Sequence, residues 1–291
     1  MFTKKCTDEP RALVRWVLDL LRRAAGLKSH VDLLFFPPAP VTWADHIISL
    51  DERAPRHREQ MDDLDAGGAA LDGALADLRW ANRWLGGWAS VRQALRPLVK
   101  ACRAARAPLR LVDLGTGGAD LPAHLVRWAD GQGVPLKVVA LDANPHAVTF
   151  ARAWLDRRLP PYLRARIEVR EGDALDLAFE EGAFDVALAA LFLHHFDAAG
   201  AARLLGQMQR VSARGLVVSD LHRHPAAYFG VKILAAARPG TSAMFAHDAP
   251  LSVRRGFRRE ELRALAARAD LNGATVRWRW AFRWVVSTVE R

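Results

Sequence analysis

The chain has 291 residues, of which 51% are hydrophobic, so it can bury the core of one large domain or of a domain with an added cap. Its formal net charge of +10 would suit a nucleic acid or an anionic membrane surface, but the basic residues are mostly scattered arginines, and only 254–259 is dense in them. We expect that cluster to be a solvated loop and helix start, and no apolar run approaches the ~20 residues that a membrane span needs.

The first 57 residues are expected to form an N-terminal extension. Residues 11–25 have the pattern of a basic amphipathic helix, which could make a peripheral membrane contact. Packing on the main domain, or poor order, is the interpretation we favour. The N-terminus lacks the layout of a signal peptide, and the distant Cys6 and Cys102 fit a reducing compartment, so we expect a cytoplasmic protein.

Residues 58–107 are predicted to form a helical cap. The pattern indicates one helix over 71–85 and a second over 91–105, separated by two glycines at 86–87. Three tryptophans follow at helical spacing (Trp80, Trp84 and Trp88), and we interpret them as packing residues rather than as a clamp for a substrate. Asn82 and Trp84 are candidates for contacts of the lid.

The segment 111–120 predicts a strand, a tight glycine loop and a helix start, which is how an open α/β sheet builds a nucleotide pocket. Gly115 and Gly117 match the first two glycines of the dinucleotide fingerprint, but Asp120 stands where its third small residue is required. No lysine follows the glycines, which excludes a phosphate-binding P-loop. The acids Asp113 and Asp120 would repel phosphate, so the pocket suits a ligand with a cationic group and no phosphates.

Further strands are predicted along the rest of the chain. Apolar or alternating runs occur at 136–142, 165–170, 183–190 and 215–220, a helix is predicted over 198–211, and the alternating runs 276–280 and 282–286 predict a closing antiparallel pair. Asn144 and Pro145 form a helix start after the second strand.

This succession resembles the class I methyltransferases that use S-adenosylmethionine. Their first motif, D/E-x-G-x-G-x-G, stands here as Asp113-Leu114-Gly115-Thr116-Gly117-Gly118-Ala119, with the third glycine displaced by one position. The resemblance covers roughly residues 108–290. It implies an α/β fold over 108–291, with a Rossmann-like, seven-stranded, mostly parallel sheet and an antiparallel C-terminal strand pair, and S-adenosylmethionine as the cofactor.

The resemblance also implies the residues that bind the cofactor. In the family, the glycine loop approaches the amino-acid half of the cofactor, the acid that ends the second strand binds both ribose hydroxyls, and a Gly-Asp-Ala turn after the third strand binds adenine. The matching positions in this chain are Asp113, Gly115, Gly117, Asp142, Ala143, Asp173 and Ala174.

Histidines after the fourth and fifth strands are the candidate general bases, because the carboxyl ends of parallel strands face one crevice. We expect His222 or His224 to be the catalytic base, with His195 next. His222, His224, His247 and Asp220 could also bind a metal. Members of the family with a Leu-His-His segment usually need none, so we expect no metal.

Residues 221–257 are interpreted as an insertion on the acceptor side, because 226–234 is apolar enough to line a pocket. The Leu-His-His-Phe segment at 193–196 is similar to that of methyltransferases of quinone biosynthesis and of polyketide phenols. The resemblance therefore implies a small, hydrophobic, phenolic or quinol acceptor and no nucleic-acid partner. Methylation of RNA is the alternative, supported by the positive charge. The sequence does not indicate an oligomeric state.

Overall fold

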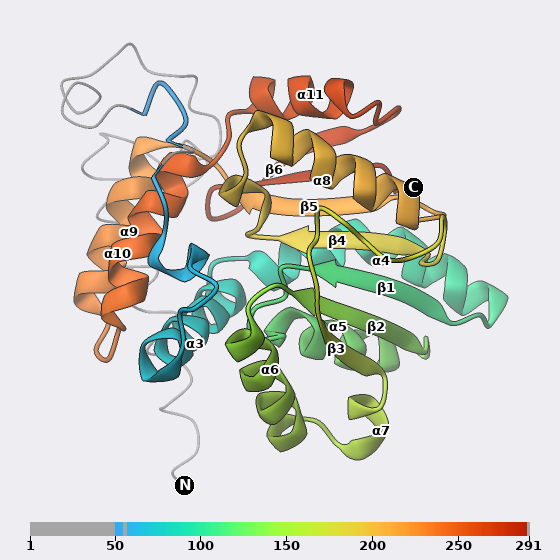
Figure 1. The fold of residues 1–291 in the computed structure, drawn as a ribbon. Helices are drawn as coiled ribbons and strands as arrows, with labels where there is room; N and C mark the ends of the chain where they lie inside the picture. The colour runs from blue at the N-terminus through green and yellow to red at the C-terminus, as the bar shows by residue number, and fades with distance from the viewer. Residues whose placement is uncertain (1–49, 55–56, 290–291) are drawn as a thin grey trace, which may run out of the picture.

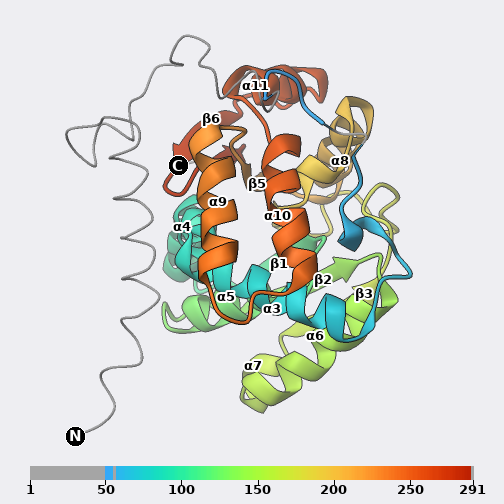
Figure 2. The same ribbon diagram turned by 90° about the vertical axis from the view of Figure 1, so that its left-hand side faces the viewer.

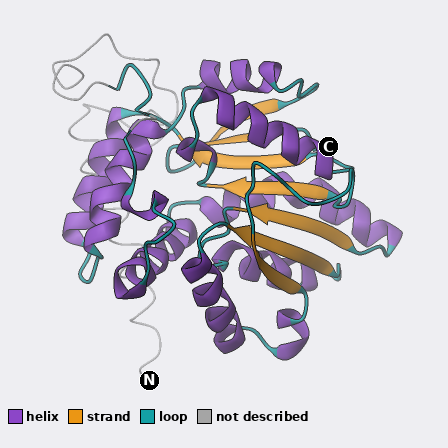
Figure 3. Cartoon of the chain, in the orientation of Figure 1, coloured by secondary structure: helices purple, strands orange, loops and turns teal. Residues whose placement is uncertain are grey.

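The computed structural model describes residues 50–54 and 57–289. The amphipathic pattern at 11–25 and Cys6 lie outside the described residues, so the expectations placed on them stay predictions. Figures 1 and 3 show a central sheet with helices on both faces, and a helical cap at one end of it.

The sheet has seven strands in the order β3-β2-β1-β4-β5-β7-β6. Their bounds are β1 (Leu109–Leu114), β2 (Leu136–Asp142), β3 (Ile167–Glu171), β4 (Val186–Ala190), β5 (Leu216–Leu221), β6 (Thr275–Arg279) and β7 (Arg283–Ser287). The first five are parallel, while β7 runs antiparallel to both β5 and β6. The predicted mostly parallel sheet with an antiparallel C-terminal pair is therefore confirmed.

The sheet is buried on both faces, as the continuous apolar runs of its central strands require. One buried cluster joins it to helices α4 (Gly87–Ala105), α5 (Asp120–Asp130), α6 (Pro145–Arg158) and α7 (Pro161–Arg164). A second cluster joins it to α8 (Ala198–Val211) and α11 (Arg259–Arg268). The strand order reverses between β1 and β4, which is where open α/β sheets place their ligands.

The second of the two helices predicted for the cap packs on the sheet instead. One stripe of α4 is fully buried (Val91, Leu95, Leu98, Val99 and Cys102), and the helix contacts β5 and β7. An apolar stripe of this length needs a matching surface, and the sheet face provides it. Gly86, at φ 75°, separates α4 from the preceding helix, so Trp88 does not continue the stripe of Trp80 and Trp84.

The cap is built from segments far apart in sequence. It consists of the short helix η2 (Gln60–Asp62), α3 (Gly68–Trp84), α9 (Pro225–Ala237) and α10 (Ala243–Arg255). Helix α10 packs against α3, α9 and η2, and it also contacts the short helix η3 (Leu193–His195) after β4. Figure 2 shows α9 and α10 side by side in front of the sheet, with α3 below them. The insertion 221–257 is therefore a helical hairpin that lies over the carboxyl ends of the strands.

Within the described ranges, none of the helices combines the length and the apolar character needed to cross a membrane.

Candidate active site

The loop after β1 has a conformation that only glycine adopts readily. Gly115 and Gly117 have φ values of 66° and 52°. A Cβ atom at Gly115 would lie 2.2 Å from the ring of Phe192, so a side chain there would displace that ring. Thr116 Oγ1 donates to Asp113 Oδ2 at 2.7 Å, and burial raises the pKa of Asp113 to about 7. Asp113 thus fixes the loop through Thr116, and the ring of Phe192 packs against Gly115.

The carboxylate of Asp142, at the end of β2, joins this loop to the next one. Its Oδ2 accepts a hydrogen bond from the backbone N–H of Gly117 at 2.7 Å, and its Oδ1 accepts from the N–H of Asn144 at 3.0 Å. Desolvation raises the pKa of Asp142. Asn144 caps α6 through the N–H of Ala147, as its sequence position predicted. Asp142 is therefore held rigidly, and each of its oxygens keeps a lone pair for a further donor.

The third loop, after β3, lies beside the second. The side chain of Asp173 is exposed and accepts a hydrogen bond from the N–H of Leu175 at 2.8 Å, while Ala174 is buried and Ala143 is exposed. These residues fit an adenosyl ligand, because a glycine loop and a fixed carboxylate with free lone pairs stand at adjacent strand ends.

Helices of the first hundred residues close over the glycine loop. A Cβ atom at Gly117 would lie 3.3 Å from Leu75 of α3. The buried carboxylate of Asp120, at the start of α5, accepts a hydrogen bond from Trp88 Nε1 at 2.8 Å, and Asn82 Nδ2 lies 3.5 Å from the same oxygen. Asn82, a candidate lid residue, thus contacts the helix that follows the glycine loop.

A cavity of about 150 Å³ lies between the cap and the strand ends. Its walls are mostly apolar and come from α3, α9, α10 and the turn between β6 and β7, with Leu78, Val231, Leu234, Phe245 and Phe282 among them. The apolar run predicted to line an acceptor pocket contributes Ala226, Ala227, Gly230, Val231 and Leu234.

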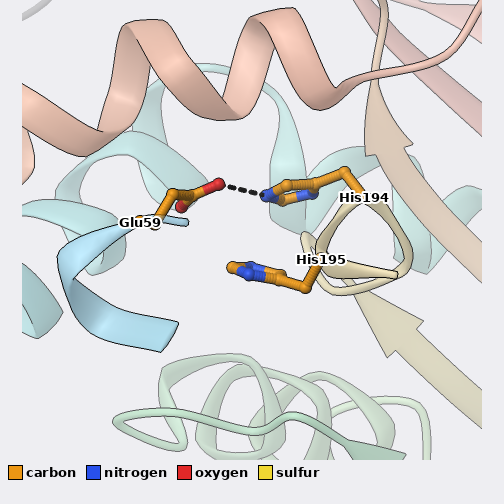
Figure 4. A group of neighbouring side chains, drawn as sticks. All are labelled: Glu59, His194 and His195. Carbon is orange, nitrogen blue, oxygen red and sulfur yellow. Dashed lines mark ion pairs between the residues drawn. The ribbon is translucent and has the colours of Figure 1, made fainter. Parts of the chain in front are cut away.

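The polar residues in the wall of the cavity include Glu59, His194 and His195, which are drawn in Figure 4. His194 Nδ1 lies 2.7 Å from Asp220 Oδ1, and its Nε2 lies 3.5 Å from Glu59 Oε1. His195 Nδ1 is hydrogen-bonded to Asp62. Two histidines, each paired with its own carboxylate, therefore meet at one edge of the cavity.

The surroundings of His194 favour its charged form. Burial by itself would lower the pKa of this ring, but the carboxylates of Asp220 and Glu59 outweigh it and raise the pKa to about 9. Burial would likewise raise the pKa of Glu59, and the nearby ring of His194 together with the charges of both histidines lowers it instead.

Arg255 holds this arrangement together from inside the protein. Its guanidinium donates to the carbonyls of His194 at 3.2 Å and of His195 at 2.6 Å, and it pairs with Asp62. Arg255 and Phe257 are buried, while Arg258 and Arg259 are exposed. The expectation that 254–259 is a solvated loop is therefore wrong for its central residues, because loop carbonyls around the cavity need an internal donor.

Comparisons with known proteins show what this chain is similar to. Residues 111–215 match the methyltransferase domain family. A demethylmenaquinone methyltransferase of Thermus thermophilus is 35% identical over 160 residues, which are 54% of this chain and 60% of that protein. These likenesses support a class I S-adenosylmethionine-dependent methyltransferase. It spans about three fifths of the curated relative that it matches.

A solved structure shows the same fold. An S-adenosylmethionine-dependent methyltransferase structure from Methanococcus maripaludis superimposes with a TM-score of 0.50 at 12% identity, over 78% of this chain and 98% of that one. A magnesium protoporphyrin IX methyltransferase of Synechocystis, solved with bound SAH, has a TM-score of 0.45 at 16% identity, over 67% of this chain and 81% of that one. The strand order and the likeness to the Methanococcus maripaludis structure confirm the Rossmann-like methyltransferase fold expected from the sequence.

The three histidines predicted as candidate bases occupy different places in the structure. His195 lines the cavity, whereas His222 and His224 are not among its wall residues. Burial, together with the charges of His224 and Arg223, lowers the pKa of His222 to about 3. His224 Nδ1 accepts a hydrogen bond from the N–H of Ala226 and so caps α9. The geometry therefore favours His195 over the other two as a proton acceptor.

Sequence reasoning missed Glu59 and Asp62. Both lie in a charged stretch without periodicity, and neither belongs to a motif. They reach the histidines only because α10 holds η2 in place, where Asp248 accepts hydrogen bonds from the N–H groups of Gln60 and Met61 at 2.9 and 3.1 Å. Tertiary packing alone brings them to the site, and no local signal in the sequence could have indicated it.

Proposed function

We propose that this chain transfers a methyl group from S-adenosylmethionine to a small hydrophobic acceptor, a phenol or a quinol. The observation that carries the proposal is the apolar cavity at the carboxyl ends of the strands, with His194 and His195 in its wall. Phe192 lies between this cavity and the glycine loop, because its ring covers Gly115 and its centroid is 6.1 Å from that of His195. The cofactor crevice and the acceptor cavity are thus neighbours.

In this proposal the strand-end residues hold the cofactor. The loop at Asp113, Gly115 and Gly117 takes its amino-acid half, and Asp142 accepts hydrogen bonds from the ribose hydroxyls. The turn at Asp173 and Ala174, beside Ala143, takes the adenine. When bound, S-adenosylmethionine supplies a sulfonium methyl group, which forms a bond to the acceptor while the carbon–sulfur bond breaks and leaves its electron pair on sulfur.

The residues around the cavity orient the acceptor and take its proton. Apolar walls exclude water and hold the acceptor in line with the methyl group, an effect that can lower a barrier by about 7–11 kcal/mol. His195 accepts the proton that the acceptor loses, since its Nδ1 is fixed by Asp62. General-base catalysis of this kind contributes about 10²–10⁴-fold.

The comparisons support a small-molecule acceptor. The Thermus thermophilus relative is named for demethylmenaquinone, and the cap leaves an apolar cavity rather than a basic groove. The buried Arg255, in the densest arginine cluster of the chain, contacts protein carbonyls and is not available to a phosphate backbone.

A labelled methyl donor tests the proposal. Purified full-length protein is incubated with isotope-labelled S-adenosylmethionine and, in separate reactions, with a panel of phenols and quinols or with total RNA. We expect mass spectrometry to find the label in at least one small aromatic product. Label found only in RNA, or in no acceptor although the donor binds, would contradict the proposal.

A further inference from the structure

Glu59 has a buried oxygen with no hydrogen-bond partner among the described residues. Its side chain is 1% exposed, and although Oε2 accepts from Ser252 Oγ at 2.8 Å, Oε1 has no such donor. The nearest cationic groups are His194 Nε2 at 3.5 Å and Arg255 Nη1 at 3.6 Å, both at the limit of a hydrogen bond. A buried carboxylate oxygen left in this state is costly unless something else binds it.

The atoms around this oxygen have the arrangement of a metal site. Glu59, His194 and His195 each offer one ligand atom, and the three atoms lie within 4.8 Å of one another. Zinc–nitrogen and zinc–oxygen bonds of about 2.0–2.1 Å in a tetrahedron place neighbouring ligands roughly 3.4 Å apart. The observed 3.5 Å between His194 Nε2 and Glu59 Oε1 matches that spacing.

Both histidines also have the outer partners that metal ligands use. His194 Nδ1 is bonded to Asp220 and His195 Nδ1 to Asp62, which leaves the Nε2 atoms for an ion. A carboxylate on the far nitrogen fixes the tautomer and the ring orientation of a ligating histidine. The pairing occurs twice here, although the two carboxylates come from different parts of the chain.

We propose that Glu59, His194 and His195 bind a divalent cation of the zinc class, whose open coordination position faces the acceptor cavity. All three residues line that cavity. Two histidines and one glutamate with an open fourth position form a ligand set that catalytic zinc uses.

The charges around the cluster suit a cation. Three carboxylates are paired with its histidines (Glu59, Asp62 and Asp220), and two guanidinium groups contact its backbone carbonyls (Arg53 and Arg255). With neutral histidines, three negative and two positive charges leave −1. The cluster therefore favours a cation over an anion.

The role of the ion rests on the proposed function, although its binding does not. An oxygen of the acceptor would fill the open position, and the ion would lower the pKa of that hydroxyl, whose proton would pass to solvent. His195 would then hold the ion instead of taking the proton. Small aromatic acceptors with an oxygen donor fit this site best.

Metal binding is measured without cofactor or acceptor. Full-length protein stripped with a chelator is titrated with Zn²⁺ by calorimetry and with Co²⁺ by visible absorption, which reports tetrahedral coordination. We expect one equivalent to bind, with the affinity lowered at least tenfold in Glu59→Gln and in His195→Gln. His247→Gln is the matched control, since this half-exposed histidine also pairs with a carboxylate but lies outside the cluster.

Circular dichroism checks that each variant is folded. The proposal is overturned if the wild-type protein binds no ion, or if both cluster variants bind as tightly as the control. If the protein transfers methyl groups but binds neither Zn²⁺ nor Co²⁺, the proposed metal site is wrong and the proposed function stands. If it binds the ion at these residues but neither binds nor uses S-adenosylmethionine, the proposed function is wrong and the metal site stands.

Discussion

At the scale of single residues, Asp142 links two loops of the cofactor crevice through its bonds to Gly117 and Asn144. Asp142→Ala should weaken binding of S-adenosylmethionine by about 10- to 100-fold, because a hydrogen bond to a charged group contributes about 1.5–3 kcal/mol. Calorimetry measures this, with Asp176→Ala as the control on an exposed turn nearby. If the two variants bound S-adenosylmethionine with equal affinity, Asp142 would not be the residue that binds the ribose.

His194 should titrate far above an ordinary histidine. Its pKa of about 9 in the folded chain exceeds the unfolded value of 6.5, so its contribution to stability is fully present below pH 6.5 and is lost as the pH rises through 9. We expect up to about 3 kcal/mol of unfolding free energy to disappear over this window. Imidazole chemical shifts, recorded with a chelator present, measure the pKa directly. Titration near 6.5 would show that Asp220 and Glu59 do not hold the proton.

Residue-scale prediction from the sequence worked where the signal was local. Asp113 and Asp142 could be placed because each ends an apolar run, and strand ends in an open sheet face one crevice. Glu59 could not be placed, because its position depends on the packing of η2 against α10. The pairing of His194 with Asp220 also depends on β4 and β5 being neighbours, which fold-level resemblance suggests but local sequence does not show.

At the scale of elements, the strand succession and the helix over 198–211 were predictable because their periodicity is clear. The hairpin of α9 and α10 was not, because α9 is apolar on most sides and shows no stripe. The packing of α4 on the sheet was also missed, since an amphipathic pattern shows that one face of a helix is buried but not which surface it packs against.

The start of α9 provides a test at this scale. His224 caps the helix through the N–H of Ala226 at 3.1 Å and stacks on Phe282, with ring centroids 5.1 Å apart. His224→Ala should lower the unfolding free energy by about 0.5–2 kcal/mol, and His224→Asn, which can cap, should recover most of it. Urea unfolding measures both. If the His224→Ala variant were as stable as the wild-type protein, the hydrogen bond of His224 at the start of α9 would contribute nothing to stability.

At the scale of the whole molecule, the fold places the proposed cofactor site and the cavity near the same strand ends. The glycine loop and Asp142, where we propose the adenosyl site, follow β1 and β2, and the cavity beneath α3, α9 and α10 is apolar with histidines in its wall. The net charge of +10 does not mark a nucleic-acid surface by itself, because arginines such as Arg223 and Arg255 are buried and bind carbonyls and carboxylates within the protein.

The central claim is that the crevice beside Gly115 and Asp142 holds S-adenosylmethionine, and calorimetry on the purified protein tests it most directly. We predict saturable binding of S-adenosylmethionine and of S-adenosylhomocysteine at one site per chain, with no heat from NADH or ATP. Absence of binding by both adenosyl compounds, together with a clear titration by NADH or ATP, would contradict the claim.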